Sequence, residues 1–283
     1  MAPPIGLGLA GPPFLRTAEG IPMKRTIRAL AGLAFLVSVA TAAEAGVQSK
    51  VWISGSTLKI RDASTGNVLD GDFSNDINVK AKRDEGVVYV VEAAGTLIVG
   101  PGCTAGSFAE DVSAGRPEDL WAPQWFTYQA KCPIAGLKKI DVNSGAGDDS
   151  VQILLSPIEI KLVGGEGADD LEYWSCDPGQ VVPYFTTKST INGGLGDDYL
   201  VGGRGPDKII GARGYDWIEG TCGADRLSGG GDGDNIVADE QNWCDMDCAP
   251  SRDVISCGDG FDGVTGDALD VWSPKLCENV DIF

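Results

Sequence analysis

Histidine is absent from this chain of 283 residues. Its absence excludes Ser-His-Asp triads, Cys-His pairs and HExxH zinc sites, and with them most histidine-dependent hydrolases. Basic residues are also scarce, because 22 Lys and Arg stand against 41 Asp and Glu, for a net charge of −19. Such a charge repels nucleic acids and anionic membranes. We therefore expect no nucleic-acid partner, and a folded state that cations would stabilise.

Long apolar runs are almost lacking. The one clear run, from Ala29 to Ala40, follows a basic start at Met23 and precedes the small-residue site Ala43-Glu44-Ala45. This order is typical of a secretory signal peptide, and the run is too short for a permanent membrane span. A buried core helix is the alternative. We interpret 1–45 as an N-terminal extension and signal peptide with the true start at Met23, and expect a secreted or cell-surface protein without a membrane span.

Cysteine is well represented, with eight residues that all follow position 100. An even number in an exported chain predicts disulfides rather than free thiols. The alternative is a zinc site, since Cys244 and Cys248 have a loosely metal-like spacing, but the lack of histidine disfavours it. We expect the pairs Cys103–Cys132 and Cys257–Cys277, with the reservation that connectivity cannot be read from a sequence.

Helical periodicity is hard to find anywhere in the chain. The region 46–140 instead contains short runs rich in β-branched and aromatic residues, separated by turn clusters. These predicted strands are 51–53, 57–60, 77–80, 87–91 and 96–99. Residues 105–124 read as a loop. Whether this N-terminal β region continues the fold of the rest of the chain stays open, and we favour one continuous coil because its first turn needs a cover.

From residue 141 onward Gly and Asp dominate with a period of nine. Five tandem units start at Gly193 and read GGLGDDYLV, GGRGPDKII, GARGYDWIE, GTCGADRLS and GGGDGDNIV. All five have Gly at position 1, Asp at position 6 and Leu or Ile at position 8. A disordered low-complexity tract has no reason to keep an aliphatic residue in phase with every Asp. Partial units extend the pattern at 144–152, 164–172 and 257–265.

This pattern resembles the hemolysin-type calcium-binding repeat (RTX) family, whose motif is G-G-x-G-x-D-x-U-x. The resemblance covers about 141–265 and implies an all-β fold, a right-handed parallel β-roll in which two units form one turn. It also implies Ca²⁺ as the cofactor, bound as several ions between stacked turns. Residues 266–283 are then a C-terminal cap. The chain departs from the family in its eight cysteines and its N-terminal signal, which argue against dedicated one-step export and a toxin role.

Two units per turn place residues 18 apart in adjacent turns, where facing carboxylates invite an oxygen-liganded cation. Insertions of 153–163, 173–192 and 238–256 would then all fall on one edge, and Cys222 would pair with Cys244 or Cys248. The expected metal ligands on the other, regular edge are Asp149, Asp169, Asp198, Asp216, Asp234 and Asp262. On the edge with the insertions they are Asp207 and Asp225.

The function that these patterns favour is a non-enzymatic, extracellular calcium-binding protein. One alternative is a β-helical polysaccharide-active enzyme, because acidic and aromatic residues gather between Asp169 and Trp174 and paired carboxylates can hydrolyse glycosides. Another is an adhesin that binds glycans or cell-surface components, which exposed Trp174 and Trp243 would support.

Overall fold

A computed structural model describes residues 47–64, 74–111, 125–175, 185–238, 248–273 and 276–282. The proposed N-terminal extension and signal peptide (1–45) lie outside these ranges. All regular structure in the described ranges is β, as the sequence predicts. None of the described segments forms a helix of the length and apolarity that a membrane crossing requires.

The strands form two sheets. In hydrogen-bonding order, the first sheet contains β20 (Val271–Trp272), β18 (Val254–Asp259), β16 (Arg226–Gly231), β14 (Lys208–Arg213), β12 (Ser189–Leu195), β10 (Glu159–Glu166), β8 (Lys139–Ala146), β2 (Thr57–Asp62), β1 (Gln48–Ser54) and β5 (Thr96–Val99). The second contains β21 (Asn279–Ile282), β19 (Gly263–Gly266), β17 (Asn235–Val237), β15 (Trp217–Glu219), β13 (Tyr199–Val201), β11 (Asp170–Trp174), β9 (Ser150–Leu154), β3 (Asp76–Lys82), β4 (Val87–Glu92), β7 (Trp125–Pro133) and β6 (Thr104–Asp111).

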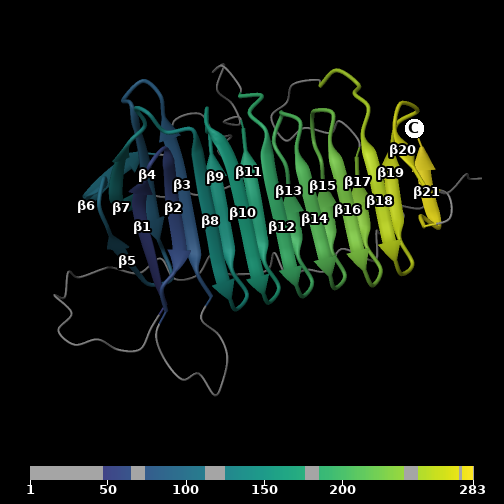
Figure 1. Cartoon of the computed structure of the whole chain (residues 1–283), viewed down its shortest axis with the longest axis horizontal. Helices are drawn as coiled ribbons and strands as arrows, with labels where there is room; N and C mark the ends of the chain where they lie inside the picture. Colours follow the sequence, from purple (N-terminus) through teal and green to yellow (C-terminus); the bar gives the residue numbers. More distant parts are fainter. Residues whose placement is uncertain are drawn as a thin grey trace, which may run out of the picture. The chain divides into compact units, whose positions relative to one another are not determined.

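From β8 onward the chain alternates between the two sheets, and every strand pairs in parallel with the strand one turn later (Figure 1). In the tandem units the register is the predicted 18 residues, as in the pairing of Ile191 with Ile209 and of Ile209 with Leu227. The nonapeptide period therefore sets a half-turn, and each pair of units makes one full turn through both sheets.

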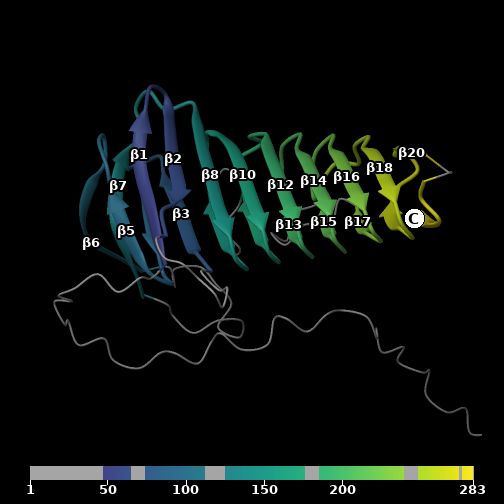
Figure 2. The same cartoon turned by 60° about the horizontal axis from the view of Figure 1, so that its bottom comes forward.

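The N-terminal β region extends both sheets without a break. Strand β2 pairs in parallel with β8, and β3 pairs in parallel with β9. Beyond them most pairing becomes antiparallel, between β1 and β2, between β3 and β4, and among β4, β7 and β6, whereas β1 pairs in parallel with β5. Figure 2 shows β2 and β3 next to β8, with β6 and β7 at the far end. The prediction of a loop over 105–124 was wrong for β6, whose sequence TAGSFAED has few β-branched or aromatic residues and so gave no strand pattern. Residues 112–124 lie outside the described ranges.

The core is a thin layer between the sheets. In the tandem units each half-turn contributes chiefly its position-8 side chain, and these aliphatics are at most 1% exposed: Leu200, Ile209, Ile218, Leu227 and Ile236. The N-terminal turns are broader. There, β10 buries both Ile160 and Leu162, and all six residues of β4 are buried. The hydrophobic layer therefore becomes narrower along the chain toward the C-terminus.

Three disulfides join described cysteines: Cys103–Cys132, Cys222–Cys248 and Cys257–Cys277. The predicted pairs Cys103–Cys132 and Cys257–Cys277 are therefore present. Cys222 pairs with Cys248, one of its two predicted partners. The connections between β9 and β10, β11 and β12, and β17 and β18 all leave the second sheet, so the insertions lie on one edge as expected. Cys176 and Cys244 lie outside the described residues.

Candidate functional site: two ladders of aspartates

The position-6 aspartates lie in the turns between the sheets and fold back over the glycine that opens their own unit. A Cβ atom added to Gly193 or Gly211 would overlap Oδ2 of Asp198 or Asp216, respectively. At Gly202 it would lie 2.8 Å from Oδ2 of Asp207. The glycine at position 1 is therefore needed by the aspartate five residues later, which explains why the two recur together.

The first Asp ladder comprises Asp149, Asp169, Asp198, Asp216, Asp234 and Asp262. Each member's Oδ1 accepts a hydrogen bond from the backbone N–H of the preceding member, at 2.8–3.0 Å. Asn75 begins the series by donating its N–H to Asp149, and Glu278 ends it by accepting from Asp262. Six carboxylates predicted from four repeat segments, which three interruptions separate, therefore form one continuous column.

The second Asp ladder lies on the opposite edge and comprises Asp207, Asp225, Asp253 and Asp270. The same type of bond joins Asp207 to Asp225 and Asp225 to Asp253, each at 2.7 Å, and Asp253 to Asp270 at 2.9 Å. Sequence reasoning found Asp207 and Asp225 but missed the last two. Each missed residue stands two places before Ile255 or Trp272, and this Asp-x-apolar remnant of the unit is the signal that could have identified them.

Burial dominates the electrostatics of both ladders. All eight aspartates predicted as ligands are at most 2% exposed. Desolvation raises the pKa of Asp169 to about 8, with neighbouring carboxylates adding to the effect. Desolvation likewise raises the pKa of Asp198, Asp234 and Asp207 to about 7, and that of Asp149 and Asp216 to about 6. The hydrogen bonds from backbone N–H groups oppose these shifts without cancelling them.

The second carboxylate oxygen, Oδ2, is buried in all six members of the first ladder. In each of them it accepts no hydrogen bond from the described residues. Such an orphaned anionic acceptor is costly unless a cation or a proton satisfies it. No three acidic or cysteine side chains among the described residues converge closely enough to hold a metal by themselves. A cation here would therefore take its ligands from carboxylates of adjacent turns and from backbone carbonyls.

Backbone carbonyl oxygens are present beside the ladder. A Cβ atom on Gly165, Gly194 or Gly258 would overlap the carbonyl oxygen of the residue stacked one turn earlier, and all three glycines have positive φ. These oxygens therefore face the following turn at close range. Carbonyl and carboxylate oxygens are the ligand types that suit Ca²⁺.

The acidic and aromatic side chains between Asp169 and Trp174 point to opposite faces of strand β11. Asp169 belongs to the first ladder, and Tyr173 is a core side chain at 1% exposure whose hydroxyl donates to the carbonyl of Ser156. The Trp174 indole donates to Glu172. Strand β11 therefore separates Asp169 from Asp170 and Glu172, which lie with Trp174 on the face opposite Leu171 and Tyr173. Trp243 lies outside the described residues.

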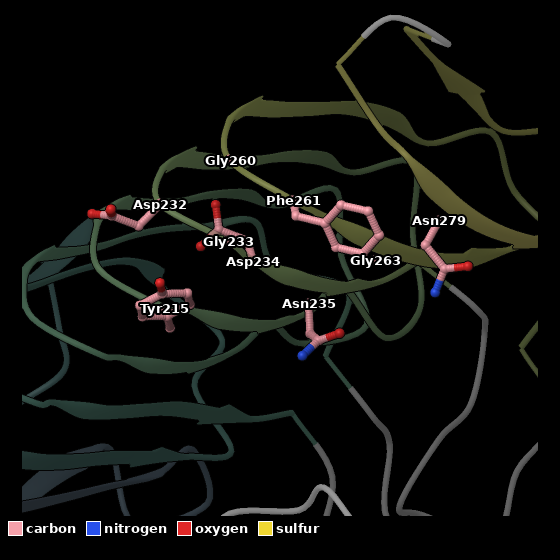
Figure 3. A pocket seen from close by; sticks show the side chains of 9 residues that line it. All are labelled: Tyr215, Asp232, Gly233, Asp234, Asn235, Gly260, Phe261, Gly263 and Asn279. Atoms are coloured by element: carbon pink, nitrogen blue, oxygen red, sulfur yellow. The ribbon is translucent and has the colours of Figure 1, made fainter.

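A shallow pocket of about 480 Å³ opens on the outer side of the first ladder near its C-terminal end (Figure 3). Tyr215 and Phe261 lie on its two sides, and Asp234 of the ladder lies between them. The amides of Asn235 and Asn279 complete one wall. Sequence reasoning missed this pocket, because its two aromatic residues are 46 positions apart.

No protein-family model, curated protein or solved structure matches the chain. The resemblance to the hemolysin-type repeat therefore rests on the nonapeptide units themselves.

Proposed function

We propose that the chain is an extracellular, non-enzymatic calcium-binding protein whose Asp ladders hold several Ca²⁺ ions between stacked turns of a right-handed parallel β-roll. The observation that carries the proposal is the column of six buried carboxylates whose Oδ2 atoms have no donor among the described residues. A divalent cation between adjacent turns would satisfy two such oxygens at once and offset their mutual repulsion.

The choice of residue supports a cation over a purely structural ladder. The hydrogen bond that each Oδ1 accepts needs only an acceptor oxygen, and an asparagine would supply it without a buried charge. The side-chain NH₂ of an asparagine could also donate a hydrogen bond to a side chain in the adjacent turn. Charged aspartates at every step of the first ladder are therefore expensive for the protein alone, and a bound cation would offset this cost at the pH where they are ionised.

Extracellular placement is supported by the disulfides, which persist in oxidising compartments. It agrees with the interpretation of 1–45 as an extension and signal peptide. Calcium is scarce in the cytosol and abundant outside cells, so metal binding would couple folding of the repeats to export.

The test is a Ca²⁺ titration of the full chain, followed by circular dichroism, with Mg²⁺ as the ionic control. We expect the β signal to rise with Ca²⁺, to reverse with EGTA and to respond weakly to Mg²⁺, which prefers shorter bonds and retains its water. A spectrum that Ca²⁺ leaves unchanged, together with no bound calcium in equilibrium dialysis, would contradict the proposal.

The chain offers a matched pair of variants for this titration. Asp149→Asn/Asp198→Asn alters two ladder members, whereas Asp148→Asn/Asp197→Asn removes the same charge from their exposed neighbours. We expect the ladder variant to bind fewer ions with weaker affinity and the neighbour variant to titrate like the original chain. Equal loss in both variants would indicate a diffuse charge effect rather than a site.

A further inference from the structure

We infer that the pocket between Tyr215 and Phe261 binds one pyranose ring of an uncharged glycan. The two aromatic side chains are 67% and 73% exposed, the highest values among the exposed large hydrophobic residues of the described chain. Each precedes an aspartate of the first ladder, Tyr215 before Asp216 and Phe261 before Asp262. Exposed aromatic faces beside a hollow are typical of ligand sites rather than of solvated surface.

The stacking of turns sets the width of the pocket. Tyr215 and Phe261 lie in turns that precede β15 and β19, and Gly233 stands in the turn between them. Adjacent strands are about 4.8 Å apart, so the turns that carry the two aromatic residues are roughly 10 Å apart, with Gly233 in the turn between them. The Tyr215 ring reaches toward this middle turn, since its Cε1 would lie 3.3 Å from a Cβ atom on Gly233. A bound sugar ring would therefore pack against an exposed aromatic face at the rim of the pocket.

Gly233 leaves room for the Tyr215 ring at the floor of the pocket. A Cβ atom at this position would lie 3.3 Å from Cε1 of Tyr215 and 2.9 Å from the carbonyl oxygen of Phe261. No positive φ requires glycine at residue 233, so close packing at the pocket floor is the reason that a side chain is not accommodated. The middle turn thus lacks the side chain that would fill the gap between the aromatic residues.

The polar lining selects the chemistry of the ligand. Asn235 and Asn279 each offer a donor and an acceptor, which matches the hydroxyl groups around the edge of a sugar ring. The apolar C–H face of such a ring suits the negative face of an aromatic side chain. Asp232 and Asp234 in the lining, within a chain of net charge −19, repel uronates and sulfated sugars. An uncharged hexose is the ring that meets all three conditions.

Affinity electrophoresis of the full chain in native gels tests this inference, with hydroxyethylcellulose, mannan, dextran or polygalacturonate cast in the gel. We expect at least one of the three neutral polysaccharides to retard the chain and polygalacturonate to have no effect. Tyr215→Ala/Phe261→Ala should raise the apparent dissociation constant, measured from the retardation, by at least about tenfold, because two aromatic faces that would stack on the sugar are lost. Leu195→Ala, which removes an exposed side chain from the same edge, should leave it unchanged.

Three outcomes would overturn the inference: no retardation by any neutral polysaccharide, equal retardation of the original and doubly substituted chains, or retardation by polygalacturonate as strong as by the neutral gels. Polylysine in a parallel gel covers the cationic-peptide alternative. Polylysine retardation that the double substitution abolishes, without neutral-glycan binding, would assign the pocket to basic peptides. A thermal melt checks that each variant is folded, and gels run with and without EGTA separate this inference from calcium binding.

Discussion

At the scale of single residues, the glycine pattern has two separate causes. Glycine at position 1 makes room for the aspartate of its own unit. Glycine at positions 2 and 4 supplies positive φ where successive turns stack, except at Gly203 and Gly205. The second requirement is met even when the residue is not glycine. Ala212, Thr221 and Asp232 stand at such positions with φ of 93°, 66° and 76°. The backbone geometry therefore belongs to the turn, and these three residues adopt it at a cost.

Substitution Ala212→Gly should stabilise the protein. A left-handed conformation costs a non-glycine residue about 1–2 kcal/mol, and glycine would remove this cost from the folded state. The greater conformational entropy of glycine in the unfolded state would offset part of the stabilisation. We expect a net increase of about 0.5–1 kcal/mol in the free energy of unfolding, measured by urea denaturation in Ca²⁺. Ala168→Gly is the control, because Ala168 has no positive φ and the substitution should lower stability or leave it unchanged.

Substitution Asp198→Asn should change stability in opposite directions with and without calcium. In EGTA at pH 8 the amide keeps the acceptor for the backbone N–H of Asp169 and removes a buried charge, so we expect about 1–2 kcal/mol of stabilisation. In saturating Ca²⁺ the same variant should be less stable than the original chain. Urea denaturation under both conditions measures this, and a variant that is less stable in EGTA as well would argue against a costly buried charge.

At the scale of elements, the first Asp ladder links adjacent turns through one hydrogen bond per step and accumulates like charges along one edge. Its pKa values set the pH dependence of the calcium-free protein. The pKa values of Asp149, Asp169, Asp198, Asp216 and Asp234 are raised in the folded state to about 6 to 8, from 3.8 for an ordinary aspartate, and that of Asp262 is raised as well. Below pH 4 both states are protonated, and above it the unfolded chain loses protons first. Stability therefore falls as pH rises from 4 through 8.

Thermal melts in EGTA between pH 4.5 and pH 8 test this expectation. The melting temperature should fall across the interval, and saturating Ca²⁺ should remove most of the decline, because a bound cation keeps the carboxylates charged in the folded state. A calcium-free melting temperature that rises over the same interval would mean that the buried carboxylates are already satisfied as anions.

At the scale of the whole described chain, the hydrophobic core and the ladders contribute unequally along its length. The broad N-terminal turns bury several aliphatic columns and carry the disulfide Cys103–Cys132. The tandem units from 193 to 237 bury essentially one aliphatic side chain for each buried carboxylate. Because so thin a core barely offsets the entropy of ordering its backbone, these units depend most on charge neutralisation.

Hydrogen exchange measured with and without EGTA should reveal this gradient. We expect removal of calcium to accelerate exchange in β12 to β17 by at least about tenfold, while β3, β4 and β9 keep most of their protection. Uniform loss of protection across both regions would mean that the chain folds as one cooperative unit. Unchanged protection in the tandem units would show that the core and disulfides suffice there.

The nonapeptide period determined the inward aliphatic column and the regular recurrence of glycine and aspartate. These features are local or repeat at a constant spacing, so a sequence displays them directly. The resemblance to the hemolysin-type repeat supplied the half-turn and, with it, the order of the first ladder. The spacings between the interrupted units also placed Asp149, Asp169 and Asp262 in the first ladder, because each spacing equals one full turn of 18 residues plus an insertion.

Only the tertiary structure decided the rest. It placed Asp253 and Asp270 in the second ladder, although neither is preceded by a complete glycine unit, because parallel pairing of β16 with β18 and of β18 with β20 fixes their height. It also turned the N-terminal strands into an antiparallel cover, whose pairing depends on contacts that strand propensity does not specify. The pocket also depends on the tertiary structure. Stacking of the turns brings Tyr215 and Phe261, which are far apart in the sequence, to the same pocket.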